Sequence, residues 1–248
     1  MNLLNRIMQV HMILHNVFYV SYLIPVSRVR PLVPHELSIA AIEQNKVFVS
    51  VVALRCEGVK AGLLPFPSFN YNQLNVRTYV TEPQTGKHAV YFLKSGVTSA
   101  LVSLLTRTIG IPWQHIDLNL QVSVDESTRN IACEVAGYWD GEFSVKSRGT
   151  QMPPEHITPF GETKSAIDYL VRPLIGCFGP EGRVRRFHIW HPEVTPFEGR
   201  LERFHFPILN SLNLVDEKEM MKPESVLYVP QARFEIYLPP VKVKSANS

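Results

Sequence analysis

The sequence has few of the residues that mark specialised classes of protein. It contains only three cysteines in 248 residues, and none of their spacings is typical of zinc ligands or of a disulfide framework. Lys and Arg number 25 against 22 Asp and Glu, and a net charge of +3 is too small to predict a nucleic-acid partner. With only 13 Gly and 19 Pro, the chain is also unlike low-complexity sequences. A packed globular protein is therefore the expectation.

No apolar run is long enough to predict a membrane-spanning helix. The most apolar stretch, residues 7–25, is interrupted by Gln9, His11 and Asn16, whereas a span needs ~20 predominantly apolar residues. The stretch also lacks the charged start and small-residue cleavage site of a signal peptide. With the low cysteine content, these observations predict a cytoplasmic protein without a membrane partner.

Motifs for cofactors and metals are missing from the sequence as well. It has no Gly-rich phosphate loop, no GxSxG elbow and no HExxH, so we expect no cofactor. His188 and His191 lie three apart on an expected strand and would point to opposite faces, which argues against a shared metal. Cys177 is interpreted as a buried core thiol, and the basic residues at 183–186 as a solvated face rather than a nucleic-acid groove.

Hydrophobic patterning predicts a mainly β protein with a few helices, an α+β class. Helices are expected at about 98–109 and 162–172, with shorter ones within 25–37 and 208–214. Residues 241–248 are expected to form a frayed tail. Strands are expected at 16–23, 46–54, 71–80, 88–93, 115–124, 131–139, 142–148, 183–190, 199–206 and 226–238. The best candidate for a domain boundary is 153–161, but a single domain over 1–248 is the simpler interpretation.

The strand at 71–80 carries the most informative pattern. Alternate side chains of a strand point to opposite faces, and one face here is polar throughout: Tyr71, Gln73, Asn75, Arg77 and Tyr79. A guanidinium among amides and phenols suits a carboxylate or a carbonyl oxygen. The pattern alone leaves two interpretations open, the lining of a pocket and a solvated sheet face.

Several motifs resemble those of the YqjF-like family of uncharacterised proteins, which is placed in the acetoacetate decarboxylase-like superfamily. The resemblance is carried by NYNQLNVRTYV at 70–80, HAVYFLKSG at 88–96 and GIPW at 110–113, with PLVPHEL at 31–37, SAIDYLVR at 165–172 and IWHP at 189–192. It implies a curved antiparallel sheet or closed barrel with a few helices packed outside and a small-molecule pocket inside. The polar face of the 71–80 strand would then point inward.

The chain departs from the superfamily at the residues that perform its chemistry. In the decarboxylases a lysine pair follows a Gly-x-Pro turn, and one lysine forms a Schiff base with the keto acid. Gly110 and Pro112 match that turn, but Trp113 and Gln114 occupy the lysine positions. Gln73 likewise stands where the family has a glutamate, and an amide cannot serve as a general acid or base.

The leading hypothesis is a pocket that binds a small carboxylate or carbonyl compound without a Schiff-base lysine. Its expected ligand-binding residues are Arg77, Gln73, Asn75, Tyr79, Trp113 and Gln114. The alternative is an active decarboxylase or aldolase-type lyase that uses a relocated lysine such as Lys94, so whether the protein is an enzyme stays open. A third alternative, self-association through the sheet without a small ligand, also stays open.

Overall fold

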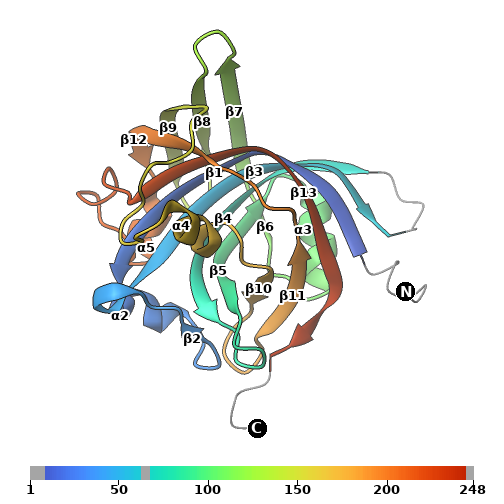
Figure 1. The fold of residues 1–248 in the computed structure, drawn as a ribbon. Helices are drawn as coiled ribbons and strands as arrows, with labels where there is room; N and C mark the ends of the chain where they lie inside the picture. The colour runs from blue at the N-terminus through green and yellow to red at the C-terminus, as the bar shows by residue number, and fades with distance from the viewer. Residues whose placement is uncertain (1–8, 63–67, 244–248) are drawn as a thin grey trace.

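The computed structural model describes residues 9–62 and 68–243, and a closed β-barrel is its centre. The barrel strands are β1 (Gln9–Pro25), β3 (Lys46–Ala61), β4 (Phe69–Thr81), β5 (His88–Val97), β10 (Ile175–Phe178), β11 (Arg185–Trp190) and β13 (Ser225–Lys242). Neighbouring strands in this order pair with one another, and pairing of β1 with β13 closes the ring (Figure 1). All of these pairs are antiparallel except β5 with β10.

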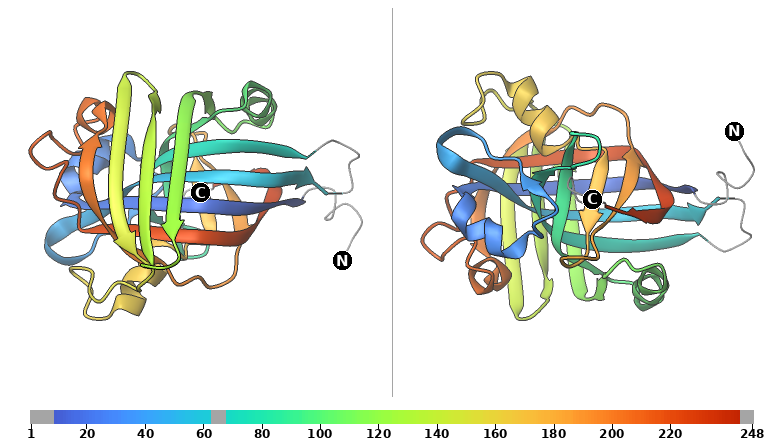
Figure 2. Two further views of the ribbon diagram at one scale, coloured as in Figure 1. Left: turned by 90° about the horizontal axis from the view of Figure 1, so that it is seen from above. Right: turned by 90° about the horizontal axis from the view of Figure 1, so that it is seen from below.

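A second layer of strands covers one side of the barrel. It consists of β12 (Phe197–His205), β9 (Glu142–Thr150), β8 (Asn130–Tyr138) and β7 (Asp117–Asp125), which pair in that order and join the barrel where β12 meets β13. Figure 2 shows these strands running across the barrel strands. The even-numbered residues Leu74, Val76 and Thr78 of β4 are buried, each at most 1% exposed.

The apolar stretch near the N-terminus forms the long strand β1. It pairs with β3 on one side and β13 on the other, so its backbone hydrogen bonds are satisfied along both edges. A register shift between His15 and Phe18 marks a bulge, where Asn16 has φ of 54°. Asn tolerates this left-handed conformation better than most residues do.

The helices are short and lie outside the barrel (Figure 1). They are α2 (Val26–Val29), α3 (Ala100–Thr108), α4 (Thr163–Leu170) and α5 (Pro207–Ser211), with 3₁₀ turns at Arg30–Leu32 and Glu43–Asn45. The short strands β2 (Ser38–Ile39) and β6 (Gln114–His115) pair with β4 and β5. Ser99 caps α3 by accepting a hydrogen bond from the backbone N–H of Val102, and Gly110 follows the helix with φ of 82°.

The prediction of a mainly β fold with a closed barrel and a few outer helices is confirmed. The expected frayed tail is wrong in part, because Val241 and Lys242 complete β13 and Val243 is 3% exposed; 244–248 lie outside the described residues. Strand β10 was not expected, and β1 and β3 are longer than their patterns indicated. Within the described residues, no helix has the length and apolar character to cross a membrane.

Candidate ligand-binding site

The interior of the barrel contains a cavity of about 80 Å³, here called the central cavity. Its wall consists of inward-facing side chains of the barrel strands together with Trp113 and two segments, 171–173 and 191–194, that follow α4 and β11. Most of the wall is apolar, with a few polar groups, a composition typical of small-molecule sites. The polar and titratable members are Tyr19, Cys56, Gln73, Asn75, Arg77, Trp113 and His191.

Strand β4 supplies the polar side of the central cavity. Gln73 and Asn75 are only 7% and 4% exposed, and both line the cavity with Arg77. The opposite face of β4 is buried as well. The solvated-face interpretation is therefore wrong, because residues on both faces of this strand are covered.

Arg77 is a cation without an anionic partner. Its Nη2 donates to the carbonyl of Leu170 at 2.7 Å, and its Cζ lies 5.3 Å and 5.7 Å from the ring centroids of Tyr19 and Tyr79. The Nε atom is buried without a hydrogen-bond partner, and no carboxylate of residues 9–62 and 68–243 pairs with the guanidinium. Burial acts to lower the pKa of Arg77, but Tyr79 and Tyr19 leave that pKa above its usual value, so the group stays charged.

The two amides beside Arg77 are fixed in a short chain of hydrogen bonds. The Cys56 thiol donates to Oε1 of Gln73 at 3.9 Å, and Nε2 of Gln73 donates to Oδ1 of Asn75 at 3.0 Å. Because Asn75 accepts through its oxygen, its Nδ2 is the donor left for a ligand. Burial raises the pKa of Cys56 to about 12, so this thiol is a donor and not a thiolate nucleophile.

Tyr79 and Trp113 have different relations to the cavity. Tyr79 is fully buried, and its hydroxyl donates to the Leu170 carbonyl at 2.9 Å and lies 2.9 Å from the Ser50 hydroxyl. Tyr79 therefore fixes the position of the Leu170 carbonyl, which also accepts a hydrogen bond from Arg77. Tyr79 itself does not line the central cavity. Trp113 does line the cavity, and its ring packs at 6.4 Å from that of Tyr71.

Gln114 was expected beside the ligand, but it lies outside the central cavity. It is exposed on β6 and accepts a hydrogen bond from Nε1 of Trp139 at 2.6 Å. Successive residues of an extended segment point to opposite sides, so Trp113 in the wall places Gln114 away from it.

Lys94 also lies outside the central cavity. Its ammonium pairs with Asp140 and lies 5.6 Å from the ring centroid of Trp139. A bulge in β5 accounts for this position. Phe92 pairs with Arg77 of β4, and Lys94 pairs with the adjacent residue Val76, so β5 has one extra residue between Phe92 and Lys94 and its alternation is interrupted there. No lysine among the described residues lines the cavity.

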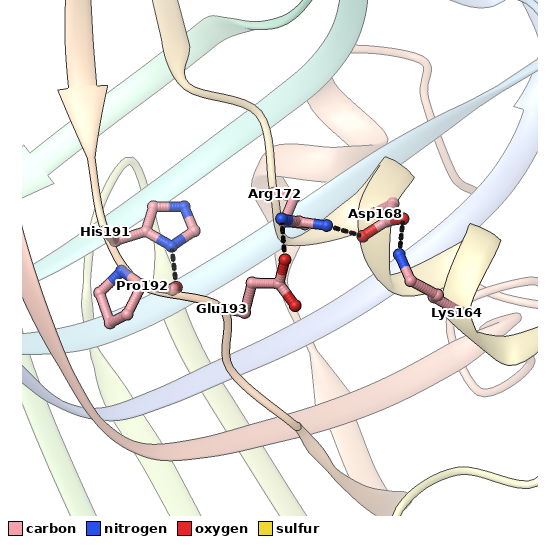
Figure 3. Close-up of polar contacts among 6 residues, drawn as sticks. All are labelled: Lys164, Asp168, Arg172, His191, Pro192 and Glu193. Atoms are coloured by element: carbon pink, nitrogen blue, oxygen red, sulfur yellow. Dashed lines mark hydrogen bonds and ion pairs between the residues drawn. The ribbon is translucent and has the colours of Figure 1, made fainter.

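His191 lines the central cavity with Arg77, although its spacing from His188 suggested no site. Strand β11 ends at Trp190, so the alternation expected for a strand does not apply to His191. Its Nδ1 lies 2.8 Å from the carbonyl of Pro192 (Figure 3), and its ring stacks on Phe234 with 5.8 Å between centroids. Burial lowers the pKa of His191, the Pro192 carbonyl opposes this, and Arg77 lowers the pKa further. A neutral ring that donates through Nδ1 presents Nε2 as a proton acceptor.

Ion pairs connect the two segments that close the cavity. Arg172 pairs with Asp168 of α4 at 2.9 Å and with Glu193 of the segment after β11, and Lys164 extends the chain along α4 (Figure 3). Val171, Pro173 and Val194, on the same two segments, form part of the cavity wall. Because solvent screens exposed pairs of this kind, they contribute little to stability.

The described residues bring together no group of three His, Cys, Asp or Glu side chains that could hold a metal ion. Cys177, interpreted from sequence as a core thiol, is fully buried, and burial raises its pKa to about 12.

A protein-family model described as "Uncharacterized conserved protein (COG2071)", the DUF2071 family, matches residues 11–233. A comparison with curated proteins gives no match.

Solved structures with a similar fold include an acetoacetate decarboxylase, an acetoacetate decarboxylase-like enzyme and an enduracididine biosynthesis enzyme. Acetoacetate decarboxylase of Legionella pneumophila subsp. pneumophila str. Philadelphia 1 has a TM-score of 0.62 at 11% identity, over 96% of this chain and 88% of that one. An acetoacetate decarboxylase-like enzyme of Sphingomonas wittichii RW1 gives 0.61 at 12%, over 95% and 93%. The enduracididine biosynthesis enzyme MppR complexed with pyruvate gives 0.58 at 12%, over 96% and 91%. The family resemblance and the fold it implied are thereby confirmed.

Proposed function

This chain belongs to the DUF2071 family and has an acetoacetate decarboxylase-like fold, and on that premise we propose that it binds a small carboxylate or carbonyl compound in the central cavity. Arg77 is the anchor of the ligand, Asn75 supplies a second donor, and Trp113 covers the cavity from the side of α3. Gln73 orients Asn75, and Tyr79 orients the guanidinium through the Leu170 carbonyl.

The uncompensated charge of Arg77 is the observation that carries this proposal. A buried charge is costly unless hydrogen bonds and an opposite charge compensate it. One guanidinium nitrogen has a protein partner, while Nε is buried without one. A ligand carboxylate supplies both the missing charge and the missing acceptors, in the planar geometry that guanidinium matches.

A keto acid is the ligand class that we favour. The space of about 80 Å³ accommodates a head group of a few heavy atoms. MppR, whose fold is similar, has been solved in complex with pyruvate, which is a small keto acid. Arg77 would hold the carboxylate, and Nδ2 of Asn75 would donate to the carbonyl oxygen.

A second candidate function, proton transfer at the carbon next to the ligand carbonyl, is favoured by His191. Its lowered pKa keeps the ring neutral, and it lines the same cavity as Arg77. Nε2 would take the proton, the electron pair would move into the enolate oxygen, and Asn75 and Arg77 would stabilise that charge. Return of the proton regenerates the keto acid, so no amine and no external reactant is needed.

Binding is tested by calorimetric titration with pyruvate, 2-oxobutanoate and acetoacetate. We expect saturable binding of at least one acid by the wild type and a large loss of affinity in Arg77→Met. Absence of binding to all three, or equal affinity in the variant, would refute the proposal.

Proton transfer is tested separately, by NMR detection of deuterium incorporation into the carbon next to the carbonyl of a bound acid. The wild type should catalyse exchange in D₂O, and His191→Gln should bind the acid but lose the exchange. Exchange at the uncatalysed rate in the wild type would leave binding as the sole function of the cavity.

A further inference from the structure

A second hollow of about 500 Å³, here called the distal groove, lies at one end of the barrel, where α3 faces the ends of β1, β3 and β4 and part of β13. Among residues 9–62 and 68–243, no charged side chain lines it, and the only polar side chains on its wall besides Tyr71 and Trp113 are two threonines of α3. Its lining residues are Val10, Met12, Val59, Ala61, Phe69, Tyr71, Leu101, Val102, Leu105, Thr106, Thr108, Ile109, Ile111, Trp113, Ile236 and Leu238.

The distal groove and the central cavity lie along the same inward face of the barrel strands. On β4, Phe69 and Tyr71 line the groove, and Gln73, Asn75 and Arg77 continue the same alternation into the central cavity. On β1, β3 and β13 as well, the residues that line the groove lie toward one end of the strand, and the residues that line the central cavity lie next to them. The two hollows are therefore consecutive sections of one barrel interior.

Among the described residues, three side chains lie between the two sections. Met12, Trp113 and Ile236 line both hollows, one face toward each. Met12 is unbranched and has three rotatable side-chain bonds, so it is the part of this partition that rotates most readily. A ligand that passes the partition would touch all three side chains.

The two sections differ sharply in chemistry. The central cavity holds the guanidinium and the amides, whereas the groove is apolar and its leucines Leu101 and Leu105 are 49% and 48% exposed. Arg77 and Tyr71 are six positions apart on β4, which corresponds to about 20 Å at the rise of an extended strand. The central cavity thus offers a binding site for an anion, and the distal groove offers an apolar surface. This combination matches a molecule with a carboxylate head and a hydrocarbon tail.

We infer that the ligand is such an amphiphile: its carboxylate binds at Arg77 and its alkyl tail passes Met12 and Trp113 into the distal groove. This inference rests on the proposed function, since it requires Arg77 to be the anchor. It adds the substrate class, an alkyl-chain keto or carboxylic acid longer than pyruvate.

The experiment is a calorimetric titration with 2-oxo acids of increasing chain length, from pyruvate through 2-oxobutanoate and 2-oxohexanoate to 2-oxodecanoate. Each methylene that enters the groove should tighten binding about fourfold, the factor that corresponds to its transfer from water. Arg77→Met should weaken all of the acids, and the alcohol of matching chain length should bind far more weakly than the acid.

Adjacent leucines of α3 provide a matched pair of variants for the tail. Leu105 lines the groove, whereas Leu104 is 62% exposed and does not line it. Leu105→Trp should remove most of the gain with chain length and leave the affinity for pyruvate unchanged. Leu104→Trp, the same substitution one position away, should leave the whole series unchanged.

The outcomes separate this inference from the proposed function. Binding of pyruvate with no gain along the series would refute the inference and leave the central cavity as the site. A gain that survives in Leu105→Trp, or an alcohol that binds as tightly as its acid, would also refute it. Failure of every acid to bind would refute the proposed function and the inference together.

Discussion

Replacement of Arg77 by methionine separates the role of its charge in binding from its role in the fold. Methionine retains an unbranched side chain of similar reach but removes all donors. A hydrogen bond to a charged group contributes about 1.5–3 kcal/mol, and a carboxylate forms two such bonds with a guanidinium. Even the lower limit, about 3 kcal/mol in total, predicts a loss of affinity of at least about 100-fold.

The same substitution should cost little stability. The Leu170 carbonyl loses the Arg77 donor but keeps the Tyr79 hydroxyl at 2.9 Å. A partly buried charge without an anion is removed at the same time, together with its buried, unpartnered Nε, which favours the folded state. We therefore expect the Tm of unliganded Arg77→Met to equal or exceed that of the wild type.

The assay is a calorimetric titration together with thermal unfolding, and Arg172→Met is the control. Arg172 forms exposed, solvent-screened pairs with Asp168 and Glu193, so its loss should leave both stability and affinity close to those of the wild type. The reasoning is refuted if Arg77→Met binds the acid as the wild type does. It is also refuted if Arg77→Met unfolds well below the wild type, since Arg77 would then be a structural residue.

Three further predictions concern other parts of the molecule. Borohydride treatment in the presence of acetoacetate should trap no imine at Lys94, and a mass-spectrometric adduct on that lysine would restore the lyase alternative. The pKa of free His191 is lowered, and the negative charge of a bound carboxylate would raise it, so binding should take up a proton and tighten as the pH falls toward that lowered pKa. Titrations over pH should show no such trend for His191→Gln, and a trend retained in that variant would assign it to another group. Gly137→Ala should lose about 1–3 kcal/mol of stability in denaturant unfolding, because the added Cβ would lie 2.0 Å from the Asp117 carbonyl oxygen. In the control Gly161→Ala the added Cβ has no atom within 4 Å, so this variant should unfold like the wild type. Equal stability of the two variants would contradict this prediction.

The polar face of β4 could be predicted from sequence because side chains alternate regularly between the two faces of an uninterrupted strand. Gln73, Asn75 and Arg77 are two positions apart, with no bulge between them on the partner β3. Their common direction therefore followed from alternation alone. The choice between pocket and solvent depended on closure of the barrel, which is not encoded near β4.

The positions of Lys94, Gln114 and His191 could not be predicted in the same way. A single bulged residue in β5 interrupts the alternation at Lys94, and no turn-forming residue in the sequence marks it. Gln114 follows Trp113 so closely that one residue of register decides which of them lines the cavity. His191 depends on where β11 ends, and strand ends are poorly defined by hydrophobic pattern.

Closure of the barrel is the least local feature of the fold. It requires β1 to pair with β13, with Gln9 opposite Tyr237 and Ser21 opposite Ser225. Both strands are long and apolar enough to be recognised as strands, but their pairing depends on the whole intervening chain. Strand β10, with only four residues, was missed because its Gly176 and Cys177 carry no strand pattern.

A crystal structure of the protein soaked with 2-oxobutanoate tests the central claim most directly. The account predicts ligand density in the central cavity, with carboxylate oxygens about 2.7–2.9 Å from the Arg77 guanidinium nitrogens and the alkyl end directed toward Met12 and Trp113. An acid bound elsewhere, with the guanidinium still engaged only by the Leu170 carbonyl, would contradict it.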